Sequence, residues 1–101
     1  MPKKSAKNNS LLKSIKANTS PQIYNLILDL INEGKDELAE IVLKIDYLLD
    51  YASTCIRQND YNEATETLHM AENRIYGLRK ENVDTKNLEY LYEGLLKKLK
   101  K

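Results

Sequence analysis

Residues 38–78 read LAEIVLKIDYLLDYASTCIRQNDYNEATETLHMAENRIYGL, and this stretch decides the fold. Its first half places apolar residues at a repeating helical spacing: Leu38, Ile41, Val42, Ile45, Leu48, Leu49, Ala52, Cys55 and Ile56. Its second half continues in alternating steps of three and four: Tyr61, Ala64, Leu68, Ala71, Ile75 and Leu78. Each spacing lays one apolar stripe along a helix. Two such stripes with a short polar connection between them predict an antiparallel helical hairpin.

Two further helical patterns flank this hairpin. The four helices are expected over residues 21–33, 37–58, 61–79 and 85–100. Ser20 and Pro21 form a strong start, because serine caps free backbone N–H groups and proline at the first helical position lacks one. The first helix is apolar on more than one face, so it lies between neighbours or leaves part of that surface exposed. Gly34 supplies its end.

The later helix starts also carry capping residues. Asp60 followed by Glu63 is close to a capping box, and Asp84 or Thr85 caps the last helix. Connections of two to five residues force consecutive helices to run antiparallel. The sequence therefore predicts an all-α fold of four antiparallel helices, either an up-and-down bundle or an open array of helical hairpins.

Length and charge divide the chain into a tail and a body. With 101 residues it is one domain at most, which we expect over residues 20–101. Residues 1–19 are basic and rich in Asn and Ser, so we expect a flexible tail that is disordered at least through Asn9. All fifteen acidic residues lie between the two lysine-rich ends. Candidate contacts for phosphate or an acidic partner are Lys3, Lys4, Lys7, Lys13, Lys16, Lys97 and Lys98.

The sequence carries no pattern for chemistry. One cysteine, Cys55, and one histidine, His69, cannot assemble a usual tetrahedral metal site. The three glycines are isolated, so no phosphate-binding loop is expected. We therefore expect no metal, no cofactor and no enzymatic activity. A single thiol and the lack of an apolar run of ~18 residues favour a cytoplasmic protein.

Tyrosines are the most suggestive surface feature, since the chain has seven of them and no Phe or Trp. Tyr47 and Tyr51 are four residues apart and share a helix face. Tyrosine is enriched at interfaces because it joins a rigid apolar ring to a polar tip. The alternative is that the tyrosines seal the rim of a core without Phe. The candidate partner-binding residues are Tyr24, Tyr47, Tyr51, Asp46 and Asp50.

Residues 48–76 also resemble a single tetratricopeptide repeat, a pair of short helices with small residues where they cross. The matching positions are Leu48, Tyr51, Ala52, Asn59, Asp60, Tyr61, Ala64, Leu68 and Ala71. The resemblance implies a scaffold for protein–protein contact without catalysis. Generic packing of a helical hairpin explains the same alanines.

Two functions follow from these patterns. The first is a small protein–protein interaction module, such as an adaptor, regulator or inhibitor, and a homodimer is one version of it. The second is a nucleic-acid-associated protein that uses its lysine-rich termini. The acidic body and the small number of arginines (Arg57, Arg74 and Arg79) favour the first.

Overall fold

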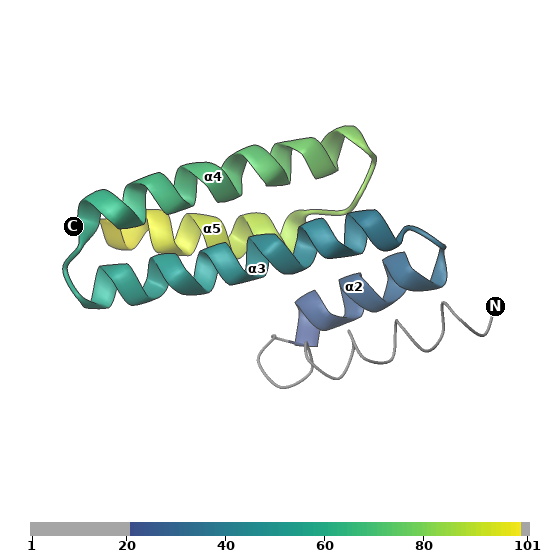
Figure 1. The fold of residues 1–101 in the computed structure, drawn as a ribbon, viewed down its shortest axis with the longest axis horizontal. Helices are drawn as coiled ribbons and strands as arrows, with labels where there is room; N and C mark the ends of the chain where they lie inside the picture. The colour runs from purple at the N-terminus through teal and green to yellow at the C-terminus, as the bar shows by residue number, and fades with distance from the viewer. Residues whose placement is uncertain (1–20, 100–101) are drawn as a thin grey trace. The chain divides into compact units, whose positions relative to one another are not determined.

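The computed structural model describes residues 21–99, of which 86% are helical and none forms a strand. Its helices are α2 (Pro21–Asn32), α3 (Asp36–Arg57), α4 (Tyr61–Lys80) and α5 (Lys86–Leu99), as Figure 1 shows. The observed helix ends differ from the expected ones by at most one residue. The predicted all-α fold is therefore confirmed. The basic tail predicted over residues 1–19 lies outside the described residues.

The chain divides into two compact units, and the boundary follows Leu43 inside α3. The first unit contains α2 and the beginning of α3. The second contains the rest of α3 together with α4 and α5. One domain over residues 20–101 stays a prediction, and so does the choice between a closed bundle and an open hairpin array.

In the first unit, α2 has one fully buried face. Its buried side chains are Ile23, Ile27, Leu30 and Ile31, which recur at the spacing of a helix stripe. Tyr24, Leu26 and Leu28 are half-buried beside this stripe. Burying one large aliphatic side chain contributes roughly 1.5–3 kcal/mol, so the isoleucines of α2 supply much of the stability of this unit.

In the second unit, the core lies on the stripe expected for α4. The buried residues of this helix are Ala64, Thr67, Leu68, Ala71, Ile75 and Leu78. Tyr61, which was expected on the stripe, is 49% exposed instead. It stands at the first position of the helix, where its hydroxyl donates to Asn59 Oδ1 at 2.9 Å. Helix α5 packs along α4, and its Leu88 is fully buried.

Three helix ends share one hydrogen-bond pattern. A residue in the left-handed conformation follows α2, α3 and α4 in turn: Gly34 (φ 78°), Asn59 (φ 64°) and Asn82 (φ 65°). At the end of α3, Asn59 N–H donates to the carbonyl of Ile56 at 3.0 Å, and Asp60 N–H donates to that of Cys55 at 2.8 Å. The same pair of bonds closes α2 and α4. This is the Schellman motif, and it satisfies carbonyls that the helix itself leaves without partners.

The turn after α4 gives a first prediction. We expect Asn82→Ala to lower the free energy of unfolding by about 1 kcal/mol, because alanine pays the full steric cost of the left-handed region whereas asparagine tolerates it. Asn82→Gly removes that cost and should leave stability unchanged or slightly raised. Urea unfolding followed by circular dichroism measures both variants.

Asn73 supplies the control for this prediction, because it is an exposed residue in the interior of α4. Asn73→Ala makes the same chemical change in right-handed backbone and should not destabilise the protein, since alanine is the better helix former. If Asn82→Ala and Asn73→Ala lower the free energy of unfolding equally, the role assigned to Asn82 is contradicted.

Candidate functional site

Helix α5 leaves part of its apolar surface exposed to solvent. It carries seven aliphatic or aromatic side chains, and only Leu88 among them is buried. Tyr90 is 77% exposed and Leu91 is 36% exposed. The remaining four are half-buried: Tyr92, Leu95, Leu96 and Leu99. The helix therefore presents apolar side chains to solvent along its length.

A groove of about 540 Å³ lies between α4 and α5. Helix α4 contributes Thr65, Glu66, Leu68, His69 and Met70 to its lining. Helix α5 contributes Tyr92, Leu96 and Leu99. Leu68 is buried, whereas Met70 is 47% exposed. The groove thus has apolar walls, with an acidic side chain and a histidine among the residues that line it.

A second hollow of about 150 Å³ adjoins the groove, because Tyr92 lines both. Helix α4 lines it with Glu72, Ile75, Tyr76 and Arg79. Helix α5 lines it with Glu89, Tyr92 and Glu93. Together the two hollows follow α4 from Thr65 to Arg79 and carry four carboxylates.

Two of these carboxylates lie close to a basic side chain. Arg79 Nε lies 3.7 Å from Glu89 Oε2, and His69 Nδ1 lies 3.7 Å from Glu72 Oε1, a pair that is charged only when the histidine is protonated. Burial, and then the negative charge of Glu72, raises the pKa of Tyr92. The shared tyrosine is therefore a neutral, half-buried ring beside acidic groups.

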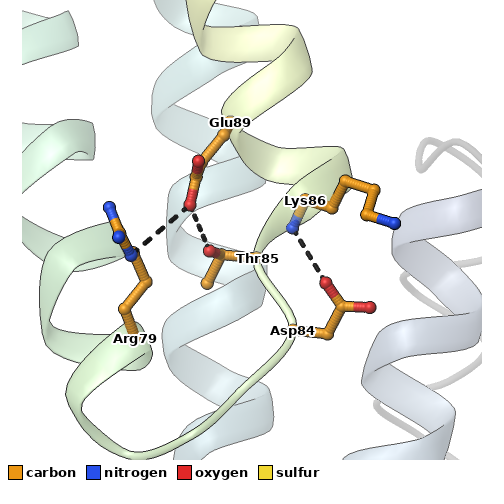
Figure 2. A network of polar contacts seen from close by, with 5 residues as sticks. All are labelled: Arg79, Asp84, Thr85, Lys86 and Glu89. Atoms are coloured by element: carbon orange, nitrogen blue, oxygen red, sulfur yellow. Dashed lines mark hydrogen bonds and ion pairs between the residues drawn. The ribbon is translucent and has the colours of Figure 1, made fainter.

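Figure 2 shows the polar contacts at the turn before α5, next to the second hollow. The carboxylate of Glu89 accepts a hydrogen bond from the Thr85 hydroxyl and pairs with Arg79. Asp84 Oδ1 accepts from Lys86 N–H at 3.1 Å. Thr85 stands at the cap position, since its carbonyl accepts the bond from Glu89 N–H at 2.8 Å. Asp84 and Thr85 thus both act at this helix start, where the sequence left the choice open.

The tyrosine face predicted for α3 is exposed in part. Tyr47 is 65% exposed and Tyr51 is 40% exposed, and Asp50 beside them is exposed. Asp46 is half-buried and has an interaction of its own. Tyr24 is half-buried on α2 in the first unit, apart from the other four in sequence.

A hydrogen bond ties Tyr51 to α4 and changes the expected capping box. The Tyr51 hydroxyl donates to Glu63 Oε2 at 3.0 Å. Asp60 Oδ1 accepts from Glu63 N–H at 3.3 Å, as the box requires. The reciprocal bond does not form, because Asp60 N–H already donates to the carbonyl of Cys55. Only half of the capping box is present, and the carboxylate of Glu63 serves the tyrosine instead.

The other candidate residues are less informative. Lys97 and Lys98 are exposed in the last turn of α5, whereas Lys3, Lys4, Lys7, Lys13 and Lys16 lie outside the described residues. Cys55 is buried. Between residues 21 and 99, no group of three potential metal ligands occurs, and no helix has the length and hydropathy needed to cross a bilayer.

No protein-family model, curated protein or solved structure significantly matches the chain. The resemblance of residues 48–76 to a tetratricopeptide repeat therefore stays a prediction, and the functional argument rests on geometry. The groove between α4 and α5 is the feature that the sequence patterns did not single out. Its signal was the seven aliphatic and aromatic residues among the fourteen of α5, more than one stripe needs.

The contact between Tyr51 and Glu63 predicts a dependence on pH. The hydrogen bond from Tyr51 to Glu63, followed by the carboxylate charge, raises the pKa of Tyr51 from 10.0 to about 12. A folded-state pKa above the unfolded value favours the protonated form, so this contribution to stability is complete below pH 10 and is lost as the pH rises towards 12. Glu63→Ala should return the pKa of Tyr51 towards 10, measured by ¹³C NMR of ring-labelled tyrosine.

Tyr47 provides the internal reference in the same spectra, because it is exposed on the same helix. Its ring signal should not respond to the Glu63→Ala substitution. A Tyr51 pKa that is equal in both proteins would contradict the contact.

The cap of α5 gives a further prediction. Thr85 is buried, and valine has its shape without the hydroxyl. Thr85→Val should lower the free energy of unfolding by about 1 kcal/mol, because the carboxylate of Glu89 loses a charge-assisted hydrogen bond. Thr65→Val is the matched control at an exposed site on α4 and should change stability by less than about 0.5 kcal/mol. If thermal or urea unfolding gives the two variants the same loss of stability, the stabilising role of the Thr85–Glu89 hydrogen bond is refuted.

Proposed function

We propose that this protein is a small protein–protein interaction module without catalytic activity. The partly exposed apolar side of α5 is the observation that carries the proposal, since Tyr92, Leu96 and Leu99 are only half-buried along a groove of about 540 Å³. An apolar patch with a polar rim is typical of a surface that another protein covers. Covering it releases roughly 25 cal/mol for each Å² of apolar surface removed from water.

The tyrosines of α3 form a second surface that supports the same function. Tyr47 is exposed, and Tyr51 is held by Glu63, so its ring loses little further freedom when a partner binds. An adaptor could therefore use two surfaces. The proposal includes a cytoplasmic location, which the single thiol supports because disulfides are rare in reducing compartments.

Self-association is one version of this activity, and nucleic-acid binding is the alternative to it. Light scattering at two protein concentrations distinguishes a homodimer from a monomer with a free surface. Lys97 and Lys98 are exposed and are the described residues that favour nucleic acid. The carboxylates beside the groove oppose it, because phosphate repels them.

The test of the proposed function is affinity capture from a lysate of the source cells with the full chain as bait. Leu96→Asp places a charge on the apolar wall of the groove and should remove the stoichiometric partners that the wild type retains. Asn87→Asp adds the same charge at an exposed position of α5 outside the groove and should retain them. Circular dichroism and unfolding curves establish that both variants fold.

Two results would count against this function. The first is a wild-type bait that retains no stoichiometric protein and stays monomeric. The second is a set of partners retained equally by Leu96→Asp and Asn87→Asp, which would place the contact away from the groove.

A further inference from the structure

The groove between α4 and α5 has an excess of negative charge along its edges. Glu89 is paired with Arg79, and Glu72 faces His69. Glu66 lines the first hollow and Glu93 the second, and neither forms an ion pair within residues 21–99. Each hollow therefore has at least one carboxylate without an ion-pair partner among the described residues. A partner that brings positive charge to both places gains two favourable contacts.

The dimensions of this region fit an α-helix. Its lining residues on α4 run from Thr65 to Arg79, which is roughly 21 Å of helix at 1.5 Å per residue. Thr65 and Leu99 line one hollow and Arg79 and Glu89 the other, so α4 and α5 run antiparallel along it. Two neighbouring helices with an apolar groove between them accept a third helix, whose apolar side chains at positions i, i+3 or i+4, and i+7 fill the groove.

We propose that this groove binds a basic amphipathic α-helix of a partner protein. The inference rests on the proposed function and adds the chemical class of the partner. The apolar side of the partner helix packs against Leu68, Leu96 and Leu99. Its lysines or arginines face Glu66 and Glu93.

A second copy of this chain is a poorer occupant of the same groove. Docking two identical grooves face to face brings the carboxylates of one copy towards those of the other, and like charges that meet at an interface oppose association. A basic helix from another protein has no such penalty. The apolar walls alone would bind a second copy of this chain and a basic helix equally well. The negative charge of the groove therefore favours the basic helix.

The binding test uses the full chain and a fluorescein-labelled 14-residue peptide of lysine and leucine, with the leucines at helical spacing. Fluorescence anisotropy should show saturable binding that weakens as NaCl is raised. A glutamate–leucine peptide with the same pattern should bind at least tenfold more weakly. A scrambled lysine–leucine peptide should also bind at least tenfold more weakly, because it has the charge without the apolar side.

Charge reversal then locates the site. The double variant Glu66→Lys/Glu93→Lys should weaken binding of the basic peptide at least tenfold. The double variant Glu40→Lys/Glu81→Lys makes the same change in net charge at exposed residues outside the groove, and its effect should stay within threefold. Circular dichroism checks the fold of both.

Three results would overturn the partner class. They are equal effects of the two double variants, equal binding of the acidic and basic peptides, or a homodimer that Leu96→Asp dissociates. A different result is that Leu96→Asp removes the captured partners but Glu66→Lys/Glu93→Lys does not weaken binding of the basic peptide. That result would refute the basic helix as the partner and would still support the interaction module. If Leu96→Asp does not change the captured partners and the charge reversal does not change peptide binding, the proposed function is refuted as well.

Discussion

A narrow apolar seam on α4 is the constraint on which the rest of the second unit depends. The steps of three and four place Ala64, Leu68, Ala71 and Ile75 in one line, with few apolar residues to either side. Alanine at two of these positions lets neighbouring backbones approach closely, but a seam of this width covers only a strip of any helix beside it. Helix α5 is apolar over a wider arc than that strip. Its surplus stays at the surface, and the groove follows from this mismatch in width.

The helices were predictable because their signals are local. Residues such as Pro21 and Gly34 set the helix ends through their own backbone preferences, which act within a few residues of chain. The half-formed capping box shows where local signals fail. The Glu63 carboxylate can complete the capping box only if Asp60 N–H is free to donate to it. That N–H instead donates to the carbonyl of Cys55 at the end of α3. A competition between two motifs that overlap at Asp60 cannot be resolved from either motif alone.

The candidate site was predictable only where exposure follows from position on one helix. Tyr47 lies off the apolar stripe of α3, and it is exposed as expected. Periodicity shows that Leu96 and Leu99 lie on an apolar face of their helix, but it does not show which neighbour covers that face. That information belongs to tertiary packing. The sequence therefore indicated a tyrosine surface on α3, whereas the partial exposure of these leucines of α5 is visible only in the structure.

Stability explains Glu89, which accepts from Thr85 and pairs with Arg79, but it does not explain Glu66 and Glu93 beside the same groove. The pair between Arg79 and Glu89 and the one between His69 and Glu72 are largely exposed to solvent, and exposed ion pairs contribute between zero and about 1 kcal/mol. Within residues 21–99, Glu66 and Glu93 form no ion pair, so neither gains even this contribution. Local features that cost stability without a compensating contact are typical of surfaces kept for a partner.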